Sequence, residues 1–251
     1  MIQTEFLEIQ NKYRNRSPEE ILTFFLKKNP NRMALASSLG AEDQVLTDMI
    51  LKIEPHARIF TLDTGRLPQE TYAAIHATMK HFGIRFEIYF PQAPAVEQME
   101  REFGPDLFYE SLEKRKQCCR VRKLEPMQRV LRTLDVWVSG LRRAQTMTRA
   151  AIQKIEWDAG NQKIKLNPLA DWTTEQVWRY LRLHKVPYNQ LHDRGYPSIG
   201  CAPCTRAIRP GEDARSGRWW WETPERQDAA PPPKECGLHY QDGKLTRRSP
   251  A

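Results

Sequence analysis

Two kinds of hydrophobic pattern alternate along the first two thirds of the chain. Short, continuous apolar runs predict buried strands at residues 32–37, 57–62, 84–90 and 134–139. Apolar residues spaced three and four apart predict helical segments at residues 18–28, 41–53, 68–82, 96–131 and 173–184. Strands separated by helices of this length pair in parallel, so the pattern predicts an α/β fold built on a parallel sheet.

The composition changes in the last fifth of the chain. From Tyr196 onward Gly, Pro, Arg and Trp are frequent and hydrophobic periodicity is weak, and the prolines at 231–233 predict a stiff, extended spacer. We find no internal repeat. We therefore expect a single domain at residues 1–205, followed at residues 206–251 by a mobile C-terminal segment that lies over this domain.

The overall composition is that of a globular protein with a basic surface. The 251 residues are 40% hydrophobic and 28% charged, and the net charge of +8 suits an anionic partner: nucleic acid, a nucleotide, or a phosphate- or sulfate-bearing substrate. The longest uncharged stretch, at residues 195–205, is too short to cross a membrane. The acidic N-terminus lacks the basic and apolar regions of a signal peptide, so we expect a cytoplasmic protein.

Two turns follow predicted strands and could face one crevice. The first, at residues 37–43, joins a strand to a helix through small residues, an arrangement that can bind a phosphate, although a plain turn capped by serine is as common. It is neither a Walker A loop nor a GxGxxG loop. The second contains Leu62, Asp63 and Thr64, and ligands of open α/β sheets lie at such strand ends.

The five cysteines are an odd number and argue against a disulfide framework. Cys118 and Cys119 are adjacent, and Cys201 and Cys204 form a C-x-x-C pair in a Gly/Pro loop. Their spacing leaves an iron–sulfur cluster, a zinc site and free thiols open. Cys236 is the odd cysteine, and its neighbours Lys234 and His239 could lower its pKa and make it a nucleophile, although a lone cysteine in a tail is more often incidental.

Basic residues lie close to these motifs in the sequence. Lys123 follows Cys119 by one helical turn, and Gly140, Arg143 and Arg149 follow a predicted strand. Four further arginines flank the C-x-x-C pair: Arg206, Arg209, Arg215 and Arg218. One guanidinium group can donate hydrogen bonds to two oxygens of a phosphate or sulfate, although any one of these arginines could simply be solvated.

These elements, in this order, resemble the assimilatory adenosine 5′-phosphosulfate (APS) reductases, the thioredoxin-dependent members of the phosphosulfate reductase family. The resemblance spans roughly residues 33–240 and rests on SSLGAED, LDTGRLP, CCRVRKLEP, GLRR, NPLADWTTEQVW, GCAPCTR, GEDARSGRWWWE and KECGLH. It implies a single domain with a Rossmann-like parallel sheet of the adenine-nucleotide α-hydrolase type. The family's GQRRDQS segment reads Gly-Leu-Arg-Arg-Ala-Gln-Thr here and is a residue shorter after it, which affects the placement of Arg149.

The resemblance also implies roles for individual residues. The four paired cysteines match the ligands of a four-iron four-sulfur (4Fe-4S) cluster: Cys118, Cys119, Cys201 and Cys204. The residues matched to the catalytic groups are Cys236, the nucleophile, with Lys123, Arg215, Arg218 and His239. The residues matched to the substrate-binding turns are Ser37, Ser38, Leu39, Gly40, Leu62, Asp63, Thr64, Gly140, Arg143 and Arg149.

The implied reaction is reduction of APS to sulfite and AMP. The Cys236 thiolate would attack the sulfur of APS, and thioredoxin would release sulfite from the resulting S-sulfocysteine. The resemblance implies a separate thioredoxin, no nucleic-acid or membrane partner, and leaves a homo-oligomer possible. The spacer and Gly237 fit a tail that closes as a lid.

Three other functions remain open at this stage. The nearest is a reductase of the 3′-phosphorylated nucleotide PAPS, a branch that typically lacks the two cysteine pairs. A second is an iron–sulfur RNA-thiolation enzyme on the same fold, in which the KECGLH segment has no role. A third is a zinc-stabilised nucleic-acid-binding protein, suggested only by the basic charge and the cysteines.

Overall fold

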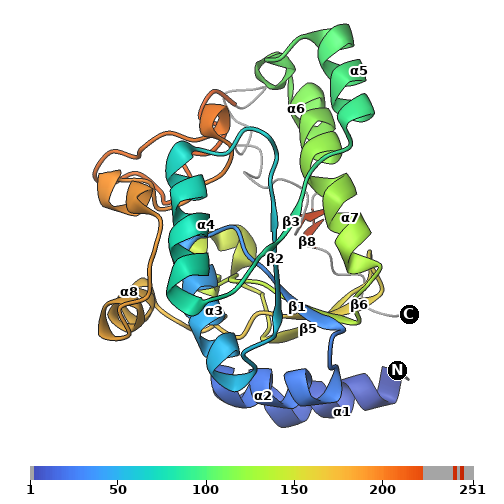
Figure 1. Ribbon diagram of the computed structural model, residues 1–251, viewed down its shortest axis with the longest axis vertical. Helices are drawn as coiled ribbons and strands as arrows, with labels where there is room; N and C mark the ends of the chain where they lie inside the picture. The colour runs from blue at the N-terminus through green and yellow to red at the C-terminus, as the bar shows by residue number, and fades with distance from the viewer. Residues whose placement is uncertain (1–2, 223–239, 242–243, 246–251) are drawn as a thin grey trace.

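The computed structural model describes residues 3–222, 240–241 and 244–245, and its centre is a six-stranded sheet in the order β3-β2-β1-β4-β6-β5 (Figure 1). The strands are β1 (Met33–Ala36), β2 (Arg58–Leu62), β3 (Glu87–Tyr89), β4 (Val136–Val138), β5 (Ile155–Asp158) and β6 (Lys163–Leu166). All neighbours pair in parallel except β5, which is antiparallel to β6. The predicted α/β fold with a parallel sheet is confirmed.

Helices cover both faces of this sheet. They are α1 (Gln3–Tyr13), α2 (Pro18–Lys28), α3 (Ala41–Ile53), α4 (Gln69–Phe82), α5 (Ala93–Phe103), α6 (Leu112–Cys119), α7 (Glu125–Leu131) and α8 (Thr174–Leu183). Side chains alternate along β1: Leu35 packs in a core with α2, α3 and α8, and Ala34 packs on the opposite face with α7. Figure 1 shows α3 and α7 on opposite sides of the sheet.

The predicted helical stretch at residues 96–131 is interrupted between α5 and α6 and is continuous from α6 through α7. Gly104, at a φ of 75°, ends α5, and the Ser111 side chain accepts a hydrogen bond from the Lys114 N–H and so caps α6. A π-helical turn, Arg120–Leu124, then joins α6 to α7. This turn follows Cys118 and Cys119 directly and carries Lys123, so it places the two cysteines and the lysine at one bend of the chain.

Two elements were not predicted from the hydrophobic pattern. The hairpin of β5 and β6 alternates apolar and polar residues, with Ile155 and Ile164 buried and Trp157 exposed, and this short period-2 pattern lies among many charges. Helix α1 lies along the hairpin, where Phe6 contacts Trp157 edge-on and the Gln10 amide donates to the Ile155 carbonyl. Its hydrophobic face is narrow, so tertiary contacts hold it in place.

The sheet order determines where a ligand can bind. The chain passes from β1 outward through β2 and β3 and then returns to β4 on the other side of β1, so the carboxyl ends of β1 and β4 lie next to each other at the point where the order reverses. Ligands of open α/β sheets bind at such a point. Three turns meet there, beginning at Ser37, Asp63 and Ser139.

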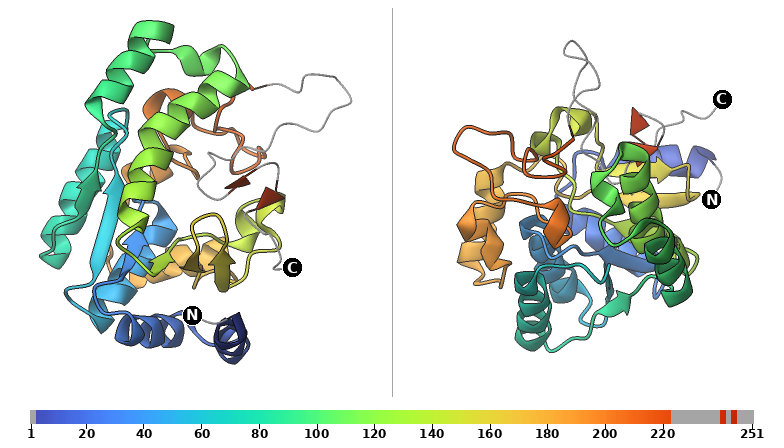
Figure 2. Two further views of the ribbon diagram at one scale, coloured as in Figure 1. Left: turned by 90° about the vertical axis from the view of Figure 1, so that its right-hand side faces the viewer. Right: turned by 90° about the horizontal axis from the view of Figure 1, so that it is seen from above.

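Residues 206–222 pack against the domain. Thr205 and Arg218 form an antiparallel bridge, Trp219 is buried, and the Arg115 guanidinium on α6 donates to the Glu222 carboxylate at 2.7 Å. Figure 2 shows this segment, in orange and red, in the same half of the molecule as α6. Two short strands, β7 (Tyr240–Gln241) and β8 (Lys244–Leu245), pair with each other. Among the described helices, none is long and apolar enough to cross a membrane.

Candidate active site

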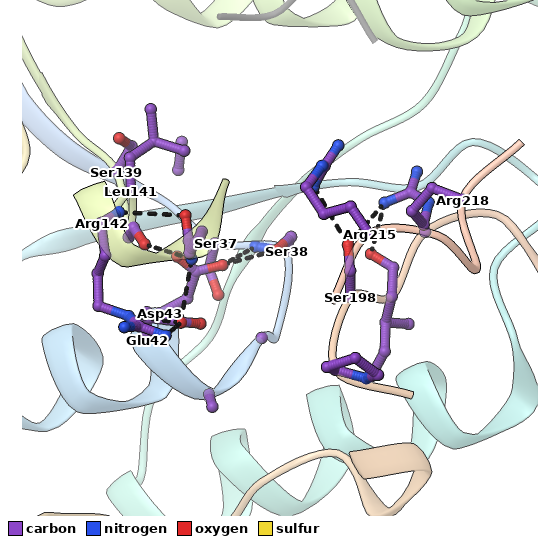
Figure 3. A pocket seen from close by; sticks show the side chains of 18 of the residues that line it. Ser37, Ser38, Glu42, Asp43, Ser139, Leu141, Arg142, Ser198, Arg215 and Arg218 are labelled. Carbon is purple, nitrogen blue, oxygen red and sulfur yellow. Dashed lines mark hydrogen bonds and ion pairs between the residues drawn. The ribbon is translucent and has the colours of Figure 1, made fainter. Parts of the chain in front are cut away.

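A cavity of about 550 Å³ opens at the carboxyl ends of β1, β2 and β4, and we call it the nucleotide cavity. Its volume suits a small-molecule ligand. Ten of the predicted residues line it: Ser37, Ser38, Gly40, Leu62, Thr64, Lys123, Gly140, Arg149, Arg215 and Arg218. Figure 3 shows two polar groups within it, one around Ser38 and Asp43 and the other around Arg215 and Arg218.

The turn between β1 and α3 is held by its own carboxylate. Asp43 accepts hydrogen bonds from the Ser38 backbone N–H and hydroxyl, each at 2.7 Å. Leu39 has a φ of 60°, and its fully buried side chain lies in the core instead of the cavity. The left-handed backbone at Leu39 turns the chain sharply into α3, whose N-cap, Gly40, makes no side-chain capping bond.

Burial raises the pKa of Asp43 to about 6, although the hydrogen bonds from Ser38 favour the ionised form and oppose this shift. The neighbouring carboxylate of Glu42 also raises the pKa. Glu42 is itself neutralised by Arg142, whose Nε donates to Glu42 Oε1 at 2.8 Å, and Gln145 donates to the same oxygen at 3.0 Å. The two carboxylates at this end of the cavity therefore already accept hydrogen bonds from protein donors.

The turn after β2 places Asp63 and Thr64 differently. Asp63 is outside the cavity lining, and its Oδ1 accepts from the Gly65 N–H at 2.8 Å and from the Tyr72 hydroxyl at 2.9 Å, so it shapes the turn. Thr64 faces the cavity, and its hydroxyl lies 3.2 Å from Cys201 Sγ. This turn thus connects the nucleotide cavity to the cysteines.

The turn after β4 presents Arg142 to the cavity, whereas Arg143 points away. The Arg143 guanidinium forms an ion pair with Asp171, and its Nε donates to the Ile152 carbonyl at 2.6 Å. Arg149 is buried in the cavity wall and donates to Gln145 at 2.5 Å. Sequence reasoning missed Arg142 and Gln145, because matching the GLRR motif indicates which segment faces the cavity but not which of two adjacent arginines does.

Arg215 and Arg218 come from the segment that packs beside α6. Arg218 is only 6% exposed, and its guanidinium lies 4.6 Å from the Trp219 ring. Gly200 leaves room for this guanidinium, since a Cβ at Gly200 would lie 2.2 Å from Arg218 Nη2. The fold therefore holds a buried cation against the nucleotide cavity.

The four cysteines of the two pairs form no disulfide and are buried, and they line a second, small cavity that we call the cysteine cavity. Lys123 and Arg218 line both cavities. Burial, reinforced by neighbouring Cys201, raises the pKa of Cys204 to about 12. Burial also acts to raise the pKa of Cys201, but Lys123, the Thr64 hydroxyl and Arg218 outweigh it and lower that pKa. Positive charge thus favours an anionic group in this cavity.

The cysteine cavity has the donor set of an iron–sulfur cluster, because four buried thiols line it together. A cubane cluster takes one thiolate on each of its four irons. Three buried donors that line the cavity have no partner in the described part of the chain: Arg122 Nε, Arg218 Nε and Trp219 Nε1. Such donors suit the sulfurs of a cluster.

Two predicted catalytic residues, Cys236 and His239, lie outside the described residues, as do the proline spacer and Gly237. Their roles stay predictions. The described residues place the other predicted catalytic groups, Lys123, Arg215 and Arg218, around the end of the nucleotide cavity that borders the cysteine cavity.

Comparison with known proteins shows the family and the fold of this chain. The phosphoadenosine phosphosulfate reductase domain family matches residues 32–207. The chain aligns with a solved phosphoadenylyl-sulfate (PAPS) reductase from Candida auris at a TM-score of 0.71 and 26% identity, over 83% of this chain and 98% of that one. It also shares its fold, at 14% identity and a TM-score of 0.54, with FMN adenylyltransferase from Candida glabrata, over 92% of this chain and 80% of that one.

The chain therefore belongs to the phosphoadenosine phosphosulfate reductase family, a family of α/β enzymes. Within it, the chain is 53% identical to adenosine 5′-phosphosulfate reductase from Allochromatium vinosum, over 84% of this chain and 79% of the relative. It is 50% identical to the protein of the same name from Burkholderia cepacia, over 83% of this chain and 81% of the relative. The resemblance found in the sequence is confirmed.

The contact between the β4 turn and α3 predicts a steric test. A Cβ at Gly140 would lie 2.4 Å from Asp43 Oδ1 and 2.8 Å from Glu42 Cβ, so Gly140→Ala must push the two turns apart. We expect this variant to lose about 1–3 kcal/mol of unfolding free energy in urea titrations. Gly40→Ala is the matched control, because its nearest neighbour would be 3.6 Å away. Equal stability of the two variants would contradict the close packing described here.

The raised pKa of Asp43 predicts a pH-dependent stability. Between pH 4 and pH 6 the folded protein keeps a proton on Asp43 that the unfolded chain has lost, so this group makes the fold less stable as pH rises. Asp43→Asn removes that dependence. We expect the unfolding free energy of Asp43→Asn, relative to the unsubstituted protein, to rise between pH 4 and pH 7 by up to about 3 kcal/mol. A constant difference across this range would show that Asp43 titrates normally.

Proposed function

We propose that this protein reduces APS to sulfite and AMP. The observation that carries the proposal is the continuity of the two cavities: the nucleotide cavity ends at Lys123 and Arg218, and the same two residues line the cysteine cavity. A nucleotide with an anionic tail would lie with its base among apolar residues and its tail at these cations. The apolar lining includes Phe60, Leu62, Met127 and Trp137.

The chemistry requires close approach of two anions. A thiolate must attack the sulfur of the sulfo group, which already carries negative charge, while the bond from sulfur to the phosphate oxygen of AMP breaks. Lys123, Arg215 and Arg218 would reduce this repulsion and stabilise the charge that grows on the departing phosphate. Arg218 is buried, and Arg215 and Arg218 both donate hydrogen bonds to Ser198, so these two cations need little reorganisation during the reaction.

Cys236 is the proposed nucleophile, and it is the one cysteine outside the paired set. Its attack would give AMP and an S-sulfocysteine. One thiolate of a reduced thioredoxin would then attack the Cys236 sulfur and release sulfite, and its second thiol would resolve the mixed disulfide, leaving oxidised thioredoxin and a reduced Cys236. The two electrons thus come from the dithiol, and the His239 and Lys234 side chains near Cys236 in sequence would favour its thiolate.

Cys118, Cys119, Cys201 and Cys204 would hold a 4Fe-4S cluster. Such a cluster would supply electrostatic and positional support next to Lys123. The chain's own residues complete the environment: Thr64 contacts Cys201, and the buried N–H groups of Arg122 and Trp219 face no other described acceptor. This hydrogen-bonding capacity supports the proposed cofactor.

Two observations favour APS over PAPS as substrate. The relatives at 40–53% identity are named adenosine 5′-phosphosulfate reductases, whereas the PAPS reductase of known structure is 26% identical. In the β1 turn, the Asp43 carboxylate already accepts both Ser38 donors. An additional phosphate at this turn would therefore not find the Ser38 donors open.

The reaction is tested by the intact mass of anaerobically purified protein after incubation with APS and no thiol. We expect an added sulfo group that peptide mapping assigns to Cys236 and that reduced thioredoxin removes. Cys236→Ser should carry no adduct, and PAPS should label the protein more slowly than APS. Absence of an adduct on protein that retains its iron would overturn the proposed reaction.

The cofactor is tested by metal and sulfide analysis of the same preparation. We expect about four irons and four sulfides per chain, as a 4Fe-4S cluster requires. Cys201→Ser should lose most of this iron, because Cys201 contacts both Thr64 and the cationic boundary of the two cavities. Cys236→Ser is the control and should retain it. Stoichiometric zinc without iron would replace the cluster with a zinc site.

A further inference from the structure

We propose that Ser198 is a positioning residue that joins Arg215 and Arg218 into one anion site, an inference that rests on the proposed function. The Ser198 hydroxyl oxygen accepts from Arg215 Nη1 at 3.2 Å and from Arg218 Nη1 at 3.4 Å. Figure 3 shows Ser198 between the two guanidinium groups. Ser198 itself lines the nucleotide cavity. No role in the family is implied for it by the sequence motifs above.

A shared acceptor offsets the repulsion between the Arg215 and Arg218 guanidinium groups. Two guanidinium groups repel each other when they are brought together away from bulk water, so a substrate-free site would tend to separate them. A serine hydroxyl has two acceptor lone pairs, and here each points to one arginine. Ser198 therefore keeps the two cations at a common point before the anionic substrate arrives, which lowers the cost of organising them on binding.

The hydroxyl proton of Ser198 then remains available. With both lone pairs engaged by arginines, the O–H points elsewhere, and in the described part of the chain it donates no hydrogen bond. Because Ser198 lines the nucleotide cavity, this proton is a third donor for an oxygen of the bound anion. The geometry points to the sulfo end of the substrate, since Arg218 also borders the cysteine cavity.

Ser198 is attached to the loop that carries two of the cysteines. It precedes Gly200, whose missing side chain admits the Arg218 guanidinium, and Cys201 follows directly. The loop is braced by hydrogen bonds from the Gly200 N–H to the Thr205 hydroxyl at 3.2 Å and from that hydroxyl to the Cys201 carbonyl at 3.0 Å. The position of the arginine pair is thereby tied to the position of Cys201.

The test compares Ser198→Ala with Ser198→Thr, using APS as substrate and AMP as a competitive inhibitor without the sulfo group. We expect Ser198→Ala to lower kcat/KM for APS about tenfold, the effect of losing one hydrogen bond to charged groups. The inhibition constant of AMP should rise by a smaller factor than kcat/KM falls, because AMP keeps the phosphate but lacks the sulfo group that the Ser198 hydroxyl would contact. Ser198→Thr keeps the hydroxyl and should restore most of the activity. Iron content should be equal in all variants.

A second measurement separates positioning from general loss of structure. If Ser198 acts through the arginines, the fold-loss of kcat/KM caused by Arg215→Lys should be at least threefold smaller in the Ser198→Ala background than in the unsubstituted protein. If the two sites were independent, Arg215→Lys would cause the same fold-loss in both backgrounds. Ser17→Ala is the control for stability: Ser17 caps α2, lies outside the nucleotide cavity lining and should leave kcat/KM unchanged.

The outcomes are distinguishable. Unchanged APS kinetics in Ser198→Ala, additive costs with Arg215→Lys, or parallel losses for APS and AMP would each overturn the role of Ser198 while leaving the proposed reaction intact. Failure of the unsubstituted, iron-containing protein to turn over APS would overturn the proposed reaction and this role together.

Discussion

The arrangement of this molecule depends on holding positive charge where water cannot fully solvate it. Lys123 and Arg218 lie between a cavity of nucleotide size and a cavity lined by four thiols, and a buried cation is costly unless anions or acceptors surround it. The chain supplies partial compensation through Ser198, the Ile199 carbonyl and the Trp219 ring. An anionic ligand would add to the compensation of Arg218, so positive charge at this boundary favours anionic contents in both cavities.

A second constraint acts at the opposite end of the nucleotide cavity, where the backbone of the β4 turn approaches the side chains of Glu42 and Asp43 on α3. The β4 turn lies so close to α3 that Gly140 has no space for a Cβ, because the Asp43 carboxylate and Glu42 fill it. Asp43 in turn engages the Ser38 donors that a phosphate-binding loop would offer to its ligand. The Ser38 donors of this turn are therefore engaged within the protein and are not open to a ligand.

Much of the fold could be predicted because its main elements carry strong local patterns. Helix α3 and strands β1, β2 and β4 follow from runs and stripes of apolar residues that have one possible buried face. Hairpin β5–β6 could not be predicted in the same way, because its buried hydrophobic residues are only three: Ile155, Ile164 and Leu166. Helix α1 depends on contacts with that hairpin and so inherits the same uncertainty.

The sequence by itself determined the α/β class, the family, the two cysteine pairs and the turns that line the nucleotide cavity, because motif spacing and hydrophobic period are local properties. The tertiary structure decided which side chains of those turns face that cavity. Arg142 faces the nucleotide cavity, whereas Arg143 pairs with Asp171. Asp63 accepts a hydrogen bond from the Gly65 N–H, and Ser198 accepts hydrogen bonds from two arginines that are distant from it in sequence. Such choices depend on packing between segments far apart in the chain, and no local pattern encodes them.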